Sequence, residues 1–255
     1  DTTNVGADLT AAGITFGASP AITTGTAATF TSNQTSHNVA AGNIVNDTNL
    51  TLAGSASFAV TGLVGDIVST NTGGMSVTLA AGATNTVGFG TSLGGTHSLN
   101  ANALTNGQVL TLTGSDAATV SFANGDVTAT NYLGALTVTG TGSTGQFTTG
   151  TASSSISSTG ATAVVATALA DGQTLTTSGA GATTITGLQA DLSDTSTAAQ
   201  SITVADVATI TLALGTDTTG TDAVVATALT DGDVLTMTGS NAATVSFANG
   251  DVTAT

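Results

Sequence analysis

The sequence contains no cysteine, lysine, arginine, glutamate or tryptophan, and most of these absences exclude a class of site. Without Cys there are no disulfides and no thiolate metal ligands. Without Lys or Arg the chain cannot form an ordinary phosphate-binding surface or a polybasic membrane patch, because nothing neutralises phosphate groups. All 15 acidic residues are Asp, so the formal charge of −15 is not offset by any basic residue. No run approaches 18 apolar residues, so no transmembrane helix is expected.

The residues that remain favour strands and turns. Thr and Val are enriched in strands, whereas Gly, Asn and Asp are typical of turns. The good helix formers Glu, Lys and Arg are missing altogether. The composition therefore predicts an all-β protein before any periodicity is considered.

A long internal repeat organises the chain. Residues 103–130 read ALTNGQVLTLTGSDAATVSFANGDVTAT, and residues 228–255 repeat this almost unchanged, 125 positions later. The same shift relates residues 23–27 to residues 148–152, both TTGTA. Because the two ends share one phase of the repeat, we expect a piece of a longer array, or a subunit whose ends continue into neighbours.

Each 125-residue unit is itself double. Gly54, Gly114, Gly179 and Gly239 occupy one equivalent position, and the spacing between them alternates between a shorter and a longer value. The predicted units are 1–125 (half-units 1–65 and 66–125), 126–250 (half-units 126–190 and 191–250) and 251–255, which opens a third.

The half-units differ in length by five residues at one place. The extra residues lie between Asp126 and Val164, compared with the stretch from Asp191 to Val224. A length change with the pattern intact on both sides predicts a surface loop.

Apolar residues alternate with polar ones over short stretches. Leu110 and Leu112, or Ile202 and Val204, are each separated by one Thr, which predicts strands with one buried face. Asn-Gly and Asp-Gly pairs lie between such stretches and predict tight turns with positive φ. They stand at residues 106–107, 171–172, 231–232 and 249–250.

Two all-β architectures fit this pattern. One is a repetitive, parallel β-helix-like β-solenoid with about three coils of roughly 20 residues in each half-unit. The other is a row of β-sandwich domains of about 125 residues. The solenoid is favoured, because its thin interior suits Ala, Val, Leu and Thr and needs no anchoring Trp. No regular period of coil length is visible inside the half-unit, which leaves the sandwich open.

The phrases LTLTGSDAATV, GALTVTGTG and GAGATTITGLQAD resemble bacterial surface-layer proteins and the repeat regions of type I secreted (RTX-type) adhesins. The resemblance extends over the whole chain and is one of composition and style; the calcium nonapeptide GGxGxDxUx is absent. It implies a secreted, cell-surface protein of a coat, matrix or adhesive kind, often calcium-dependent and often self-assembling.

Asp residues suggest calcium as a possible cofactor, because Ca²⁺ prefers carboxylate and carbonyl oxygens. The candidate metal ligands form three near pairs. They are Asp231 with Asp233, Asp191 with Asp194, and Asp217 with Asp222. The alternative is that these residues form turns and supply solubilising charge.

Other candidate sites are weaker. His37 and His97 have neither Cys nor a third His to complete a zinc site, so surface positions are expected for both. Thr-x-Thr elements, such as Thr111 with Thr113, suggest an ice-binding face or simply the outward Thr of a strand. Sequons for N-glycosylation begin at Asn33, Asn46 and Asn49.

No motif points to an enzyme, so the sequence predicts a non-enzymatic extracellular structural protein. The first hypothesis is a self-assembling surface layer, sheath or filament whose partner is another copy of itself. The second is the spacer or stalk of a large secreted adhesin, in which each repeat contacts only neighbouring repeats of one chain. Neither nucleic acid nor membrane insertion is expected.

Overall fold

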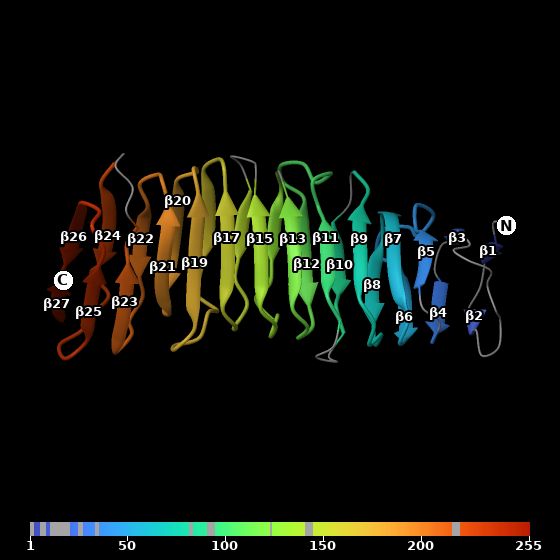
Figure 1. Cartoon of the computed structure of the whole chain (residues 1–255), viewed down its shortest axis with the longest axis horizontal. Helices are drawn as coiled ribbons and strands as arrows, with labels where there is room; N and C mark the ends of the chain where they lie inside the picture. The colour runs from blue at the N-terminus through green and yellow to red at the C-terminus, as the bar shows by residue number, and fades with distance from the viewer. Residues whose placement is uncertain are drawn as a thin grey trace. The chain divides into compact units, whose positions relative to one another are not determined.

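The computed structural model describes residues 3–5, 9–10, 21–24, 28–33, 36–81, 84–90, 95–122, 124–140, 145–215 and 220–255. Every regular element in these stretches is a β-strand (Figure 1). The chain divides into two compact bodies. The first body comprises residues 1–127 and 131–135, and the second comprises residues 128–130 and 136–255. No helix capable of crossing a membrane is found in the described stretches.

The first body contains thirteen described strands, and β14 (Asp126–Thr128) reaches its boundary. They are β1 (Thr3–Val5), β2 (Leu9–Thr10), β3 (Ala21–Thr24), β4 (Ala28–Ser32), β5 (Ser36–Ala40), β6 (Asn49–Gly54), β7 (Ser57–Leu63), β8 (Asp66–Ser69), β9 (Met75–Leu79), β10 (Asn85–Gly88), β11 (His97–Asn100), β12 (Val109–Thr113) and β13 (Ala118–Phe122).

The second body contains the remaining thirteen described strands. They are β15 (Leu136–Gly140), β16 (Gln146–Thr148), β17 (Ser154–Ser158), β18 (Thr162–Val165), β19 (Thr174–Gly179), β20 (Thr183–Leu188), β21 (Asp191–Ser196), β22 (Ser201–Val204), β23 (Thr209–Ala213), β24 (Asp222–Ala226), β25 (Val234–Thr238), β26 (Ala243–Phe247) and β27 (Asp251–Ala254).

Successive strands alternate between two parallel sheets, so that each coil of the chain adds one strand to each sheet. In the first body β5 pairs with β7 and β7 with β9, whereas β4 pairs with β6 and β6 with β8. The second body follows the same rule (Figure 1). This is the predicted β-solenoid. The sandwich alternative is wrong, because sandwich sheets are built from antiparallel strands.

Apolar side chains stack in rows through the interior. One row of the first body runs through Val39, Val60, Val77, Leu99 and Val120, each at most 2% exposed. Because side chains alternate along a strand, each strand contributes such residues to the interior and sends the residues between them outward. Neighbouring coils bury one another's apolar side chains, so each coil depends on the coils beside it.

The equivalent glycines each end a strand or directly follow one, at a point where the backbone needs positive φ. Gly54, Gly114, Gly179 and Gly239 have φ of 102°, 121°, 98° and 118°. A Cβ at any of the four would collide with a carbonyl oxygen of an earlier coil, such as the Phe89 carbonyl at Gly114. Both the dihedral angle and the missing space require glycine there.

The predicted tight turns are confirmed at all four Gly pairs, with φ of 84°, 74°, 94° and 82° at Gly107, Gly172, Gly232 and Gly250. In the first of these turns the Gln108 N–H donates to the Thr105 carbonyl at 3.0 Å. The turns connect strands of the two parallel sheets.

The predicted surface loop is wrong, because the five additional residues accompany an additional strand. Three strands, β15, β16 and β17, lie between β14 and β18. Only two, β22 and β23, lie between β21 and β24, although Val164 of β18 and Val224 of β24 are equivalent. Coils of different length can therefore stack with their strands in register.

Candidate functional site

The Asp231–Asp233 pair lies in a turn before β25, where the Asp233 carboxylate is already engaged. Its Oδ2 accepts hydrogen bonds from the Thr230 backbone N–H at 2.7 Å and from the Thr230 hydroxyl at 2.9 Å. The backbone N–H, and then the hydroxyl, hold the pKa of Asp233 below its usual value. Asp231 is exposed. This pair combines a turn-forming carboxylate with a carboxylate that faces solvent.

The Asp191–Asp194 pair is divided between the two faces of β21. Asp194 is 4% exposed, and its Oδ1 accepts from the Thr177 hydroxyl at 2.6 Å and from the N–H and hydroxyl of Ser196. Asp191 points outward and accepts from the Thr211 N–H at 2.8 Å. One cation cannot bridge two carboxylates on opposite faces of a sheet, so these residues do not form a joint site.

The third pair is incompletely described, because Asp217 lies outside the described residues. Asp222 begins β24 and is 1% exposed. Among the described residues no group of three or more His, Cys, Asp or Glu side chains is placed to hold a metal ion. Of the described candidates, the carboxylates that remain accessible to Ca²⁺ are those of Asp231, Asp233 and Asp191.

The expectation that His37 and His97 lie on the surface is wrong. His37 is 4% exposed and His97 is 0% exposed. They occupy one equivalent position of the half-unit, which continues at Thr162 and Asp222 with the same alternating spacing as the equivalent glycines. All four residues are buried and lie at or next to the start of a strand. We call this position the polar corner.

At the polar corner of β11, His97 connects three parts of the chain. Its Nδ1 accepts from the Met75 N–H at 3.1 Å, and its Nε2 lies 3.1 Å from Oδ2 of Asp116. Nδ1 can accept only while it is unprotonated, so this contact places the ring proton on Nε2, directed at the carboxylate. Phe89 stacks on the ring at 4.9 Å.

Tyr132 closes the same corner of the first body. Its hydroxyl donates to the Asp116 carbonyl, and its ring meets Phe89 edge-on at 6.4 Å. Burial, and then the charge of Asp116, raise the pKa of this phenol. The His97–Asp116 pair therefore lies beneath aromatic rings, away from any solvent-borne substrate.

In the second body the same corner is built from different side chains. Asp222 replaces His97, and its Oδ1 accepts from the Gln200 N–H at 2.7 Å. Its Oδ2 lies 3.4 Å from Nδ2 of Asn241, which replaces Asp116. The backbone N–H that is satisfied belongs in both cases to the residue 22 positions earlier, Met75 or Gln200.

The chemistry conserved between the two corners is hydrogen-bond acceptance from a buried backbone N–H. A buried N–H without an acceptor costs about 1–3 kcal/mol, which explains why both His97 and Asp222 are polar although they are buried. Aligning the half-units would have exposed this position, because it is polar in all four copies. The two histidines alone do not reveal this equivalent position, because Thr162 and Asp222 occupy it in the other two half-units.

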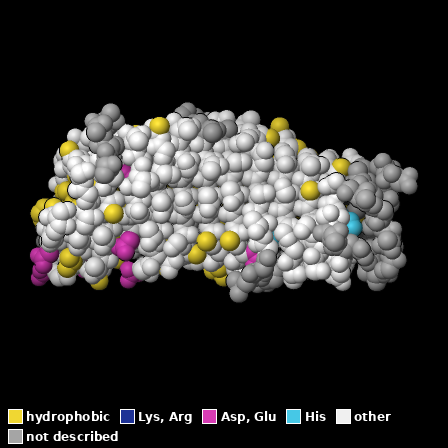
Figure 2. All heavy atoms as spheres, viewed as in Figure 1, with side chains coloured by type: hydrophobic (Ala, Val, Ile, Leu, Met, Phe, Trp, Pro, Cys, Tyr) yellow, Lys and Arg dark blue, Asp and Glu magenta, His cyan; other side chains and the backbone are white. Residues whose placement is uncertain are grey.

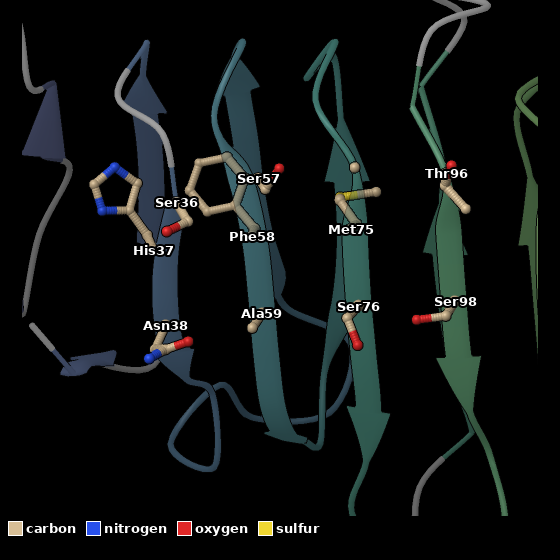
Figure 3. Close-up of a pocket in the computed structure, with 11 residues that line it drawn as sticks. Ser36, His37, Asn38, Ser57, Phe58, Ala59, Met75, Ser76, Thr96 and Ser98 are labelled. Carbon is tan, nitrogen blue, oxygen red and sulfur yellow. The ribbon is translucent and has the colours of Figure 1, made fainter. Parts of the chain in front are cut away.

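A groove of about 270 Å³ lies in the first body across β5, β7, β9 and β11 (Figure 3). Small side chains at Ala59 and Gly74 leave its floor low, and the hydroxyls of Ser36, Ser57 and Thr96 lie along it. His37, Phe58 and Met75, which form one row across the paired strands, also line the groove. The groove offers hydrogen bonds but no charged side chain.

Elsewhere the outer faces are covered mainly by small hydroxyl side chains. In the second body one outward column runs through Thr137, Ser155, Thr176 and Ser193. The predicted Thr-x-Thr pairs point outward, but Ser, Ala and Asp share their columns. Figure 2 shows a largely white surface with scattered hydrophobic atoms, and with Asp side chains concentrated toward the carboxyl end of the second body.

All three sequons begin at exposed residues, Asn33, Asn46 and Asn49. Residues 34 and 35, which complete the sequon of Asn33, lie outside the described stretches. Glycosylation stays a prediction.

No protein-family model, curated protein or solved structure matches this chain.

Proposed function

We propose that this chain is an extracellular structural protein whose coils are the building element of a surface layer, sheath or filament. The observation that carries the proposal is the polar corner. The most enzyme-like pair in the described residues, His97 with Asp116, is buried beneath aromatic rings and satisfies a backbone N–H. The same position holds Asp222 with Asn241 in the second body, so its side chains vary while its structural task stays the same.

Composition supports the same proposal. With no Lys and no Arg, the outer faces offer no target to proteases that cleave after basic residues, and they form no intramolecular salt bridges with Lys or Arg. The −15 charge must be balanced by cations from solvent. Neighbouring copies would then associate through hydroxyl-lined faces, with calcium screening or bridging the exposed carboxylates.

The second proposal is a spacer within a large adhesin, and one observation favours it. Only five large hydrophobic side chains among the described residues are notably exposed, and four of them are single outward positions such as Val68 and Val225. Monomeric proteins rarely expose large apolar patches, and these outer faces have none that would bind a second copy strongly.

Self-association distinguishes the two proposals. The purified chain is examined by sedimentation velocity and negative-stain electron microscopy, with and without millimolar Ca²⁺, over a range of protein concentration. Sheets or fibres support the structural-assembly proposal. Particles that remain monomeric at every concentration, in both buffers, contradict it and support the spacer.

A matched pair of variants tests the calcium element. Replacing Asp231 and Asp191, whose carboxylates face outward, with Asn should abolish any calcium-dependent association. The control is Asp194→Asn, because that buried carboxylate is engaged by Thr177 and Ser196. Calcium dependence that survives in the Asp231/Asp191 variant would contradict the assignment of these carboxylates.

A further inference from the structure

The groove of the first body is the strongest remaining feature, because polar side chains from four neighbouring strands meet there. One line of residues crosses β5, β7, β9 and β11 in register, and it consists of Asn38, Ala59, Ser76 and Ser98 (Figure 3). A second line lies at the first residue of each strand or directly before it, and it consists of Ser36, Ser57, Gly74 and Thr96. The groove therefore runs across the strands rather than along one of them.

The hollow in the middle of the groove is produced by the smallest residue of each line. Ala59 belongs to β7, and Gly74 directly precedes β9, the strand that pairs with β7. A Cβ at Gly74 would lie 2.9 Å from the Thr96 carbonyl oxygen, so this position has no room for a side chain. The hollow is therefore set by the backbone and by these two residues.

The polar side chains around the hollow are available to a ligand, because they make no hydrogen bond within the described part of the chain. They are Ser36, Asn38, Ser57, Ser76, Thr96 and Ser98.

Several outward hydroxyls elsewhere are engaged by the preceding coil. Those of Thr61, Ser178 and Thr195 donate to carbonyl oxygens of Val39, Ile156 and Thr177. The groove thus collects free donors and acceptors at one place.

The second body provides an internal reference, because the repeat places the same strands there without the same chemistry. Asn38 and three serines of the groove are replaced by alanine at the equivalent positions, which are Ala161, Ala163, Ala182 and Ala223. Thr184 replaces Ala59, so a larger side chain stands where the hollow lies in the first body. A coil stack thus forms without these polar groups, and folding does not require them.

The lining indicates a neutral ligand that is rich in hydroxyl groups. No Asp lines the groove, and the chain has no Lys or Arg. A phosphorylated or carboxylated ligand would find no basic partner and would be repelled by the formal charge of −15. Phe58 and Met75 lie beside the hydroxyls, so the lining is both polar and apolar. Sugars have the matching surface, because their rings combine hydroxyl edges with apolar C–H faces.

The spacing of the strands indicates which kind of sugar chain fits. Parallel strands lie about 4.8 Å apart, close to the rise per sugar of an extended β-1,4-linked chain. The polar side chains of the groove repeat at that interval from β5 to β11, over about 14 Å. Successive sugars could therefore meet successive strands.

We propose that this groove binds an extended, neutral β-1,4-linked glycan of unsubstituted hexoses, with one ring in the hollow above Ala59 and Gly74. The adjoining rings contact the polar side chains of β5 on one side and of β11 on the other. An unsubstituted ring suits a hollow of about 270 Å³, which is small for a ligand site. The inference goes beyond the proposed scaffold and does not depend on self-assembly.

The direct test is a titration of the 255-residue chain with cellotetraose, followed by ¹H–¹⁵N NMR spectra. Maltotetraose is the matched control, because it contains the same sugar in α-linked, curved chains. We expect saturable shifts at residues 36–38, 57–59 and 74–76, and binding of maltotetraose that is weaker by about tenfold or more. Absence of saturable shifts with cellotetraose, or equal binding of maltotetraose, would overturn the proposal.

Variants taken from the second body locate the site. Ala59→Thr introduces the residue of Thr184 and fills the hollow, so it should weaken cellotetraose binding about tenfold or more. Asn38→Ala introduces the residue of Ala163 and should weaken binding about threefold, because the amide is lost. Ser155→Ala, on the second body, is the control and should leave binding unchanged.

Melting temperatures verify that each variant is folded. Should Ala59→Thr unfold, Asn38→Ala still decides the question, because its side chain is exposed and makes no hydrogen bond within the described residues. Wild-type affinity in both groove variants would overturn the proposal.

Spectra of the sugar-free chain at several protein concentrations separate this site from self-association. Cellotetraose binding by a chain that stays monomeric supports the glycan site while contradicting self-assembly. Shifts at the groove that grow with protein concentration, and that cellotetraose does not reverse, would assign the groove to a second copy of the chain and overturn the proposal.

Discussion

The position shared by His37, His97, Thr162 and Asp222 is buried in all four copies, although its side chains differ chemically. His97 and Asp222 each accept a hydrogen bond from a backbone N–H 22 residues earlier, whereas the Thr162 hydroxyl lies 2.6 Å from the Ser158 hydroxyl and donates to the Gly160 carbonyl. A second side chain contacts the other polar atom of this acceptor: Asp116 contacts Nε2 of His97, and Asn241 contacts Oδ2 of Asp222. The two partners therefore have to change together.

The variants His97→Asp and Asp116→Asn test this coupling. His97→Asp alone places a second carboxylate beside Asp116 in a buried corner, which should lower the free energy of unfolding by about 3 kcal/mol. Adding Asp116→Asn recreates the Asp222–Asn241 arrangement and should restore most of the loss. Chemical denaturation of the single and double variants measures both. A double variant no more stable than His97→Asp would contradict the proposed equivalence of the corners.

His37 should make folding sensitive to mild acid. Burial lowers the pKa of this imidazole from its ordinary value of 6.5, so the unfolded chain binds the proton more readily. The stability that His37 contributes is therefore complete above pH 6.5 and falls as the pH drops toward its folded-state pKa. His37→Thr introduces the residue found at the equivalent Thr162 and removes this titration.

Urea denaturation at pH 7.5 and pH 5.5 provides the measurement. The wild-type chain should lose more stability between these values than His37→Thr does, with His97 present in both. Equal losses of stability in the wild-type chain and in His37→Thr would contradict the claim that burial of His37 makes folding sensitive to acid.

Asp47 is the single described non-glycine residue with positive φ, at 61°. It occupies the turn position that Gly107, Gly172 and Gly232 hold in the other half-units. Asp47→Gly removes a left-handed cost of roughly 1–2 kcal/mol and adds an entropic cost of roughly 0.5–1 kcal/mol. We expect a net stabilisation of about 0.5 kcal/mol by thermal denaturation, and a similar loss for the reverse change, Gly107→Asp. A destabilised Asp47→Gly would contradict this account of the turn.

At the scale of the strand and its turns, most of the fold could be predicted from sequence. Leu110 and Leu112 are buried and Thr111 faces outward, as period-two alternation requires. Asn106 and Gly107 form the expected tight turn. These features are local, and local residue preferences suffice to predict them.

Coil length could not be predicted, because it varies from coil to coil. Phe58 pairs with Met75 and Val87 pairs with Leu112, so the coil 58–75 is much shorter than the coil 87–112. A search for one fixed period averages over such coils and finds nothing. The five-residue insertion does not form the predicted loop for the same reason, since a coil pattern of variable length can absorb another strand.

The candidate site was predicted less well than the fold. Proximity in sequence suggested the pair Asp191 and Asp194, but three positions along a strand place side chains on opposite faces. The burial of His97 depends on Met75 and Asp116, which lie 22 and 19 residues away. Such long-range partners are visible only once the coils are stacked.

Two glycine substitutions test whether close approach between neighbouring coils requires glycine at the end of a strand. Gly114→Ala combines an unfavourable φ with a collision against the Phe89 carbonyl, so it should cost at least about 2 kcal/mol. Gly172→Ala is the matched control: its φ is 74°, but its Cβ would meet open space, so about 1 kcal/mol is expected. Denaturation curves give both values. Equal losses would contradict the claim that close approach between coils requires glycine at residue 114.

At the scale of the whole molecule, stability depends on what lies beside each coil. The same five residues, ATVSF, are well covered in β13 and largely uncovered in β26. Local propensity is identical in the two copies, so any difference in protection must come from neighbouring coils. The proposed role as a stacked, extensible scaffold depends on this property.

Hydrogen–deuterium exchange with mass spectrometry directly measures the difference in amide protection between β13 and β26. Peptic fragments of the two copies differ in mass because Asp116 is replaced by Asn241. At low protein concentration we predict slow exchange across β13, whose end is covered by residues 131–135, and exchange many times faster across β26. Equal exchange in the two copies would contradict the claim that each coil is stabilised by its neighbours.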